Sequence, residues 1–148
     1  MIVEIEGDLV KQAGQFDVIA HGCNCFCTFG AGIAKAIREK FPEAYYEVDL
    51  TTKKGDRSKL GTITFTKNTT PVIINCYTQY NYGREKGRVY CSYDAIRSCM
   101  KEIKAKFHGK KIGLPKIGCN LAGGDWAIVN QIIADELGQE DVTIVILK

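Results

Sequence analysis

Runs of hydrophobic residues with alternating or continuous spacing predict six β-strands in this chain. The first run, residues 1–6, alternates apolar and acidic side chains, which is typical of a strand with one buried face. The last run, residues 141–147, is nearly all apolar, as in a strand covered on both faces. The other four predicted strands are residues 17–21, 61–66, 71–77 and 111–115.

Hydrophobic residues with helical spacing fill most of the intervals between these runs. Ile33, Ile37 and Phe41 share one face of a predicted helix. Residues 43–53 can form a second helix, because Pro42 suits a first helical position. Two further stripes predict helices, namely Ile96, Cys99, Ile103 and Phe107, and Val129, Ile132, Ile133 and Leu137.

Strands that alternate with helices indicate an α/β protein whose mostly parallel sheet is covered on both faces. The chain has 148 residues, and no repeat, linker or low-complexity tract interrupts it. We therefore expect a single domain, residues 1–148. In such sheets ligands bind at the carboxyl ends of the strands.

Two glycine-rich segments follow predicted strands and precede predicted helices. They are Gly30-Ala31-Gly32-Ile33-Ala34 and Gly118-Cys119-Asn120-Leu121-Ala122-Gly123-Gly124. A strand followed by bare backbone and a helix N-terminus presents N–H groups that bind phosphate. The pair of segments predicts a ligand with two phosphates, or with a phosphate and a ribose.

Composition narrows the classes of function and location. The formal net charge of +3 is too small to indicate a nucleic-acid-binding protein, and we interpret Lys53-Lys54 and Lys110-Lys111 as solvated faces. No apolar run has membrane-spanning length, and residues 1–6 do not resemble a signal peptide. Seven cysteines without a secretory signal favour free thiols in a reducing compartment. We expect a cytoplasmic monomer.

Three of the cysteines raise the alternative of a metal site. Cys23, Cys25 and Cys27 alternate, so they would project on one face of an extended segment. Their spacing is not that of a zinc site, and no second pair accompanies them. We interpret most of the cysteines as buried small hydrophobic residues and expect neither a metal nor another cofactor.

Two residues next to the glycine segments are candidates for acid–base chemistry. His21 ends a predicted strand, where its imidazole would emerge near a phosphate and act as an acid or base; the alternative is a core histidine bonded to a neighbouring carbonyl. Asp125 suits the N-cap of the last predicted helix. If Asp125 faces the ligand instead, its charge repels a phosphate, and it fits a role in orienting water or a histidine better than one in binding.

Three other polar features have two interpretations each. Asn24 either binds a ribose hydroxyl or caps a turn, and its place beside the first glycine segment favours the ligand. Asp8 either accepts from an exocyclic amine, as adenine presents, or belongs to an ordinary turn, which composition alone favours. Residues 80–88, rich in aromatic and cationic side chains, either cover a nucleotide or form a solvated connection, and we favour the connection.

Taken in order, these segments resemble the macrodomain family, whose members bind ADP-ribose. The resemblance covers essentially the whole chain and rests on Gly7-Asp8-Leu9, His21-Gly22-Cys23-Asn24, Gly30-Ala31-Gly32-Ile33-Ala34, Tyr77-Thr78-Gln79 and residues 117–126. It implies a three-layer α/β/α sandwich around a mixed six-stranded sheet. It also implies adenine near Asp8, the diphosphate over residues 30–34, and the distal ribose near Asn24 and residues 118–124.

The resemblance thereby implies a set of substrate-binding residues and two catalytic candidates, His21 and Asp125. The binding residues are Gly7, Asp8, Leu9, Gly22, Cys23, Asn24, Gly30, Ala31, Gly32, Ile33, Ala34, Thr78, Ile117, Gly118, Cys119, Asn120, Leu121, Ala122 and Gly123.

Within the family, His21 before Gly-Cys-Asn and Trp126 after the second segment resemble the branch that dephosphorylates ADP-ribose 1″-phosphate. A neighbouring branch removes ADP-ribose from modified acidic side chains with a lysine placed directly after a threonine. Here Gln79 takes that position, and Ala122 takes the place of that branch's aspartate. Both departures disfavour lysine-based cleavage, although Asp125 lies close by in the sequence.

We therefore expect a phosphatase that works without a metal and releases phosphate from ADP-ribose 1″-phosphate. The loop N–H groups would hold the phosphates, and Asp125 or His21 would activate water. Two alternatives stay open. One is a hydrolase that removes ADP-ribose from proteins, nucleic acid or acetylated metabolites, and the other is a module that binds free or attached ADP-ribose without turnover.

Overall fold

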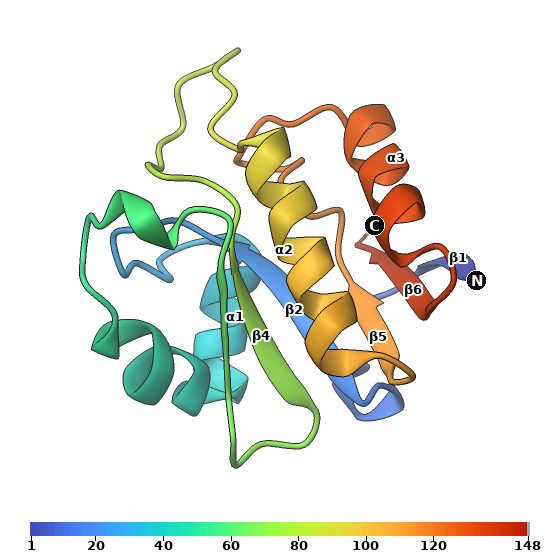
Figure 1. Cartoon of the computed structure of the whole chain (residues 1–148). Helices are drawn as coiled ribbons and strands as arrows, with labels where there is room; N and C mark the ends of the chain where they lie inside the picture. The colour runs from blue at the N-terminus through green and yellow to red at the C-terminus, as the bar shows by residue number, and fades with distance from the viewer. Residues whose placement is uncertain (148) are drawn as a thin grey trace.

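The computed structural model describes residues 1–147 and contains a six-stranded sheet between two helical layers (Figure 1). The strands are β1 (Ile2–Glu6), β2 (Val18–Cys23), β3 (Ile63–Phe65), β4 (Val72–Tyr77), β5 (Lys111–Leu114) and β6 (Asp141–Ile146). The helices are α1 (Gly32–Lys40), α2 (Tyr93–Phe107) and α3 (Trp126–Leu137). The strand order is β1-β6-β5-β2-β4-β3, and only β3 runs antiparallel to its neighbour. The predicted mixed, mostly parallel sheet is confirmed.

Alternate residues of the central strands face opposite helical layers. Val18 and Ala20 of β2 pack in the hydrophobic cluster that contains the buried faces of α2 and α3. Ile19 and Cys23 belong to a second cluster, together with Ile37 of α1. In Figure 1, α2 and α3 lie in front of the sheet and α1 lies behind it. The predicted α/β/α sandwich is therefore confirmed, with both sheet faces removed from water.

Three predicted elements differ from those observed by more than one residue at an end or in type, and one of them is β3, which is shorter than the strand predicted over residues 61–66. Strand β2 continues to Cys23, two residues beyond its predicted end. The helix predicted over residues 43–53 is instead a π-helical turn (Ala44–Val48) followed by a 3₁₀ turn (Asp49–Thr51). These turns direct Asp49 into the core, where its Oδ1 accepts a hydrogen bond of 2.7 Å from the Tyr77 hydroxyl. Because a buried carboxylate needs a hydrogen-bond partner, the contact with Tyr77 holds this segment against β4.

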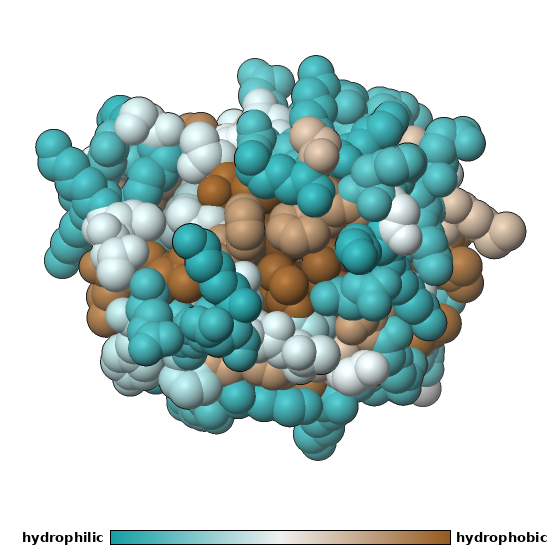
Figure 2. Space-filling view, turned by 60° about the horizontal axis from the view of Figure 1, so that its bottom comes forward, coloured by the Kyte–Doolittle hydropathy of each residue, from teal (hydrophilic) through white to brown (hydrophobic). Residues whose placement is uncertain are grey.

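A few large hydrophobic side chains stay at the surface. On the face shown in Figure 2, hydrophobic side chains gather in the middle and polar ones surround them. The exposed residues include Tyr82, Leu121 and Ile128. No helix within residues 1–147 is long and apolar enough to span a membrane.

The packing of α3 against the sheet predicts a contrast between two isoleucines of that helix. Ile133 is 0% exposed and Ile128 is 43% exposed. Replacing Ile133 with Ala should lower the free energy of unfolding by about 2–5 kcal/mol, because it leaves a cavity in the core. Ile128→Ala, the matched control, should change it by about 0.5 kcal/mol. Urea denaturation measures both, and equal losses would contradict the observed burial of α3.

Candidate functional site

The two glycine segments lie side by side at the carboxyl edge of the sheet. We call residues 30–34 the first glycine loop and residues 118–124 the second glycine loop. The first follows β2 and begins α1, and the second follows β5 and precedes α3. A Cβ atom placed on Gly32 would lie 4.0 Å from Leu121 Cδ1, so the two loops face each other.

Backbone N–H groups of both loops have no hydrogen-bond acceptor among residues 1–147. In the first glycine loop they belong to Gly30, Ala31, Gly32, Ile33 and Ala34, and in the second to Gly118, Asn120, Leu121 and Ala122. Donors of this kind at the start of a helix form a site for an anion. The arrangement therefore suits a ligand with more than one negatively charged group.

The N-terminus of α1 differs from those of the other two helices. Ser92 caps α2 by accepting from the Ala95 N–H, and Asp125 caps α3 by accepting from the Ala127 N–H. The N-cap of α1 is Ala31, whose side chain has no acceptor. Because the helix dipole is positive at this uncapped end, it favours an incoming phosphate.

Three chain segments converge beneath the loops at Gly22 of β2. A Cβ atom there would lie 2.7 Å from Thr78 Oγ1 and 3.3 Å from Ile117 Cγ1. Thr78 follows β4, and its buried hydroxyl has no hydrogen-bond partner among the described residues. An unpaired buried hydroxyl costs about 1–3 kcal/mol, so Thr78 leaves a polar atom under the second glycine loop for a water or a ligand.

His21 lies in the core and not at the rim of the sheet. Its side chain is 0% exposed, and its Nε2 lies 2.7 Å from Asn75 Oδ1. Asn75 Nδ2 donates to the Ala44 carbonyl, so Oδ1 faces His21 and Nε2 is the donor. Burial lowers the pKa of His21 to about 4, against a smaller opposing effect of Asn75. Because β2 extends two residues beyond His21, the expectation that the imidazole emerges near a phosphate is wrong.

The imidazole of His21 instead supports the approach to the first glycine loop. Its ring meets that of Phe29 edge-on, with 5.1 Å between centroids. Phe29 is buried and directly precedes Gly30. Of the two interpretations from the sequence, the structure favours a core histidine.

Asp125 is exposed and stands directly after the second glycine loop. Its Oδ1 accepts from the Ala127 N–H at 2.9 Å, which confirms the predicted N-cap. Its own N–H donates to the Tyr93 hydroxyl at 3.0 Å. The second carboxylate oxygen has no partner among residues 1–147, so it is available to a water molecule.

Asn24 and Asp8 both stabilise turns of their own segments. Asn24 accepts from the Phe26 N–H at 2.8 Å and donates to Thr28 Oγ1 at 2.7 Å. Its side chain is therefore occupied, against the preference for a ribose contact. One carboxylate oxygen of Asp8 accepts from two backbone N–H groups of its turn, while the other has no partner in the described chain.

Several residues predicted to bind substrate are buried. Leu9, Cys23, Thr78, Ile117 and Ala122 are each less than a tenth exposed. The side chains of Leu9 and Cys23 pack in the core cluster beneath α1, so contact of either side chain with a ligand is not supported.

The cysteines do not supply a nucleophile at the loops. Six of the seven are buried, and Cys119 in the second glycine loop is partly exposed. Burial, with a smaller effect of Cys91, raises the pKa of Cys119 to about 11, so its thiol is protonated at neutral pH. No group of three or more His, Cys, Asp or Glu side chains with metal-binding geometry occurs within the described residues.

A contact that sequence analysis missed holds the second glycine loop from the side. The N–H groups of Tyr90 and Cys91 both donate to the Ala122 carbonyl, at 2.7 and 3.3 Å. A Cβ atom on Gly123 would lie 2.5 Å from the Arg88 carbonyl oxygen. The segment expected to be a solvated connection therefore continues into a support of this loop. Because the partners lie about thirty positions apart, local sequence pattern gives no signal for it.

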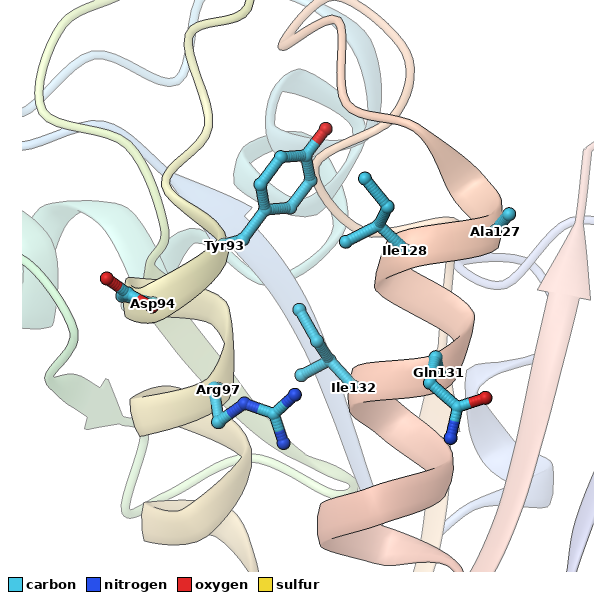
Figure 3. A pocket seen from close by; sticks show the side chains of 7 residues that line it. All are labelled: Tyr93, Asp94, Arg97, Ala127, Ile128, Gln131 and Ile132. Atoms are coloured by element: carbon cyan, nitrogen blue, oxygen red, sulfur yellow. The ribbon is translucent and has the colours of Figure 1, made fainter.

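A separate surface groove lies between α2 and α3 (Figure 3). Its lining comprises Tyr93, Asp94, Arg97, Ala127, Ile128, Gln131 and Ile132. Arg97 is already paired with Asp135 at 3.1 Å and Glu136 at 2.7 Å. No residue predicted to bind substrate lines this groove, so the two glycine loops remain the candidate site.

Fold and loops together define an α/β/α protein whose sheet presents, at its carboxyl edge, unpaired N–H groups suited to an anionic ligand. Comparison with known families identifies that class more closely. The chain belongs to the macrodomain family, because the family model of the Macro domain matches residues 20–133.

Several known proteins are similar to this chain over most of its length. An uncharacterized 17.5 kDa protein from the tk-vs intergenic region of Enterobacteria phage T4 is 32% identical, over 98% of this chain and 96% of its own. An ADP-ribose 1″-phosphate phosphatase of Candida albicans is 28% identical, over 85% of this chain and 87% of its own. The structure of Thermosipho africanus DarTG in complex with ADP-ribose has the same fold, with a TM-score of 0.76 over 99% of this chain and 41% of that chain, at 17% identity.

The environment of His21 predicts an unusual titration. In NMR spectra its imidazole should titrate with a midpoint near pH 4. Because this pKa lies below the ordinary value of about 6.5, the unfolded state takes up the proton first, and stability falls as the pH drops from about 6.5 towards 4. The His21 component should amount to about 2 kcal/mol between pH 7 and pH 5.

The variant His21→Gln isolates this component, because glutamine keeps a donor for Asn75 Oδ1 and does not titrate. Urea unfolding of both proteins at the two pH values gives the difference. An imidazole midpoint near 6.5 would show that His21 is not enclosed as described.

Proposed function

We propose that this macrodomain binds ADP-ribose at its two glycine loops and hydrolyses ADP-ribose 1″-phosphate to ADP-ribose and phosphate. The observation that carries the proposal is the pair of facing loops with unpaired N–H groups. The N–H groups form two separate sets, one in each loop, and this matches a ligand with a diphosphate and a further phosphorylated ribose. The name of the Candida relative supports the activity, and the ADP-ribose in the Thermosipho complex supports the ligand.

In this proposal the diphosphate lies against the uncapped start of α1. The N–H groups of residues 30–34 donate to its oxygens, and the helix dipole adds a favourable field. At the other end of the ligand, the free N–H groups of Gly118 and residues 120–122 receive the 1″-phosphate and stabilise the charge that develops as it is transferred. Phosphoryl transfer depends mainly on such positioning and electrostatic stabilisation.

Asp125 is the group that fits the activation of water. Its free carboxylate oxygen is exposed at the end of the second glycine loop, and its other oxygen fixes the side chain to α3. A carboxylate in this position orients a water molecule and accepts its proton. His21 has no direct part, because it is neutral and enclosed, and it acts by holding Phe29 beneath the first glycine loop.

Asp8 fits the adenine end of the ligand. A shallow hollow on the far flank of α1 is lined by Asp8, Val10, Lys11, Ala36, Glu39 and Lys40. The unpaired oxygen of Asp8 is an acceptor for an exocyclic amine. Adenine presents such a donor, so its position near Asp8 agrees with a diphosphate at the start of α1.

Asp125→Asn tests the catalytic assignment without removing the helix cap. Asparagine caps a helix as well as aspartate does, so the fold should be retained. Phosphate release from ADP-ribose 1″-phosphate should fall by about 10²- to 10⁴-fold, because the general base is lost. Affinity for ADP-ribose, measured by calorimetry, should stay constant or rise slightly as the repulsion between Asp125 and phosphate disappears.

Asp94→Asn is the matched control, since it removes the same charge from an exposed position in the first turn of α2. Its phosphate release should equal that of the parent protein. Full activity in Asp125→Asn would overturn the role of Asp125. Tight ADP-ribose binding without phosphate release would select the binding module, and release of ADP-ribose only from modified macromolecules would select the hydrolase.

A second test uses the missing cap of α1, where binding and stability should change in opposite directions. Ala31→Asp places a carboxylate where it can accept from the free N–H groups, so the free energy of unfolding should rise by about 0.5–2 kcal/mol. The same carboxylate occupies the donors and repels phosphate, so ADP-ribose affinity should fall about tenfold or more. Ala31→Asn separates the two effects, because it caps without charge and should weaken binding less. Unchanged affinity in Ala31→Asp would exclude the first glycine loop as the diphosphate site.

A further inference from the structure

Three segments far apart in the sequence meet beyond the carboxyl ends of β2 and β4. The Cys25 N–H donates to the Tyr80 carbonyl at 3.0 Å, and the Gly55 N–H donates to the Cys25 carbonyl at 2.7 Å. The Tyr80 hydroxyl donates in turn to the Gly55 carbonyl at 2.9 Å. Residues 24–28, 53–59 and 79–92 therefore form one continuous surface, and in Figure 1 the last of these is the long yellow-green connection before α2.

Aromatic rings form the centre of this surface. Phe26 meets Tyr80 at 4.9 Å and Tyr82 at 6.3 Å between ring centroids, both edge-on. The Arg57 guanidinium lies over the Tyr80 ring, 3.8 Å from its centroid. Tyr82 is 52% exposed, so its ring is open to a planar partner. We call the surface formed by these rings and the surrounding cations the basic aromatic surface.

Positive charge is concentrated on the same three segments. Their exposed cations are Lys53, Lys54, Arg57, Arg84, Lys86 and Arg88, and their carboxylates are Asp56 and Glu85. With the buried Lys59 included, the three segments carry seven cations and two carboxylates, an excess of five positive charges. Because the formal net charge of the whole chain is +3, the rest of the chain carries a formal charge of −2. The low net charge of the sequence therefore conceals a strongly asymmetric distribution.

The basic aromatic surface adjoins the glycine loops. At one end Phe26 lies between β2 and the first glycine loop. At the other end the Arg88 carbonyl touches Gly123, and Tyr90 and Cys91 bind the Ala122 carbonyl. A long anionic molecule lying on this surface would therefore pass beside the second glycine loop.

We propose that the basic aromatic surface binds a single-stranded polynucleotide. The exposed cations contact the phosphates, and the open Tyr82 ring stacks on a base. A single strand fits better than a duplex, because only unpaired bases offer their faces to an aromatic side chain. A single strand also fits better than an acidic peptide, because the carboxylates of such a peptide would contact the cations but would not stack on the aromatic rings. The proposal stands independently of the reaction at the glycine loops.

The test is fluorescence anisotropy with a labelled single-stranded oligothymidylate of about 16 nucleotides, at low salt and with excess free ADP-ribose present. The parent protein should bind, and affinity should fall as salt rises, with a log–log slope of about −2 to −4 from the release of counterions. Replacing Arg57, Arg84 and Lys86 together with Gln should weaken binding about tenfold or more. Tyr82→Ala should weaken it about fivefold or more through lost stacking.

The matched control replaces Lys101, Lys104 and Lys110 with Gln, which removes the same charge from exposed positions on and after α2. It should change affinity less than twofold. Absence of binding at low salt, an equal loss in both triple variants, no loss in Tyr82→Ala, or equally good competition by polyglutamate would each overturn the proposal. Calorimetry with ADP-ribose on the first triple variant should match the parent, so failure here is distinguishable from failure of the glycine-loop site.

Discussion

The close approach of three chain segments at Gly22 is the constraint on which the candidate site depends. A Cβ atom at position 22 would lie only 2.7 Å from Thr78 Oγ1 and 3.3 Å from Ile117 Cγ1, so a larger residue does not fit there. Without a side chain at this position, the connections after β2, β4 and β5 meet at one point on the sheet edge. The first and second glycine loops then face each other, because their strands are neighbours and their connections leave the sheet together. The close approach at Gly22 thus brings the two glycine loops together, so that their N–H groups form one surface suited to an anion.

The site combines a rigid support with unsatisfied donors. Beneath it, a chain of buried and partly buried hydrogen bonds joins His21 to Asn75, Asn75 to Thr64, Thr64 to Tyr77 and Tyr77 to Asp49. Every link spans different strands or turns, so the network fixes the layer under α1. Above it, the N–H groups of the first glycine loop lack the side-chain cap that α2 and α3 possess. A side-chain cap would stabilise this helix, so the open end leaves its donors available to the proposed ligand.

Sequence patterns predicted the parts of this structure that depend on local periodicity, and missed those that depend on contacts between distant residues. The strands, three of the helices and both loops follow from hydrophobic spacing and glycine placement. The break at residues 43–53 does not, because the partner of Asp49 is Tyr77 on β4. Likewise the sequence does not decide between a rim and a core position for His21, because pairing with Asn75, which extends β2, is not visible in the chain. The basic aromatic surface joins charges about thirty positions apart, which the net charge alone conceals.

The titratable groups around the loops leave few ways of carrying out chemistry there. The imidazole of His21 is neutral and has no path to a ligand, and the Cys119 thiol stays protonated at neutral pH. A covalent cysteine intermediate and a histidine proton shuttle therefore both lack a suitable group at this edge. The groups that remain for chemistry are the fixed N–H dipoles of the two glycine loops and the exposed carboxylate of Asp125 beside them. Such a site accelerates a reaction in which charge develops on phosphate oxygens and water is the nucleophile. Phosphate monoester hydrolysis has both properties, so one geometry accounts for the proposed binding and for the proposed reaction.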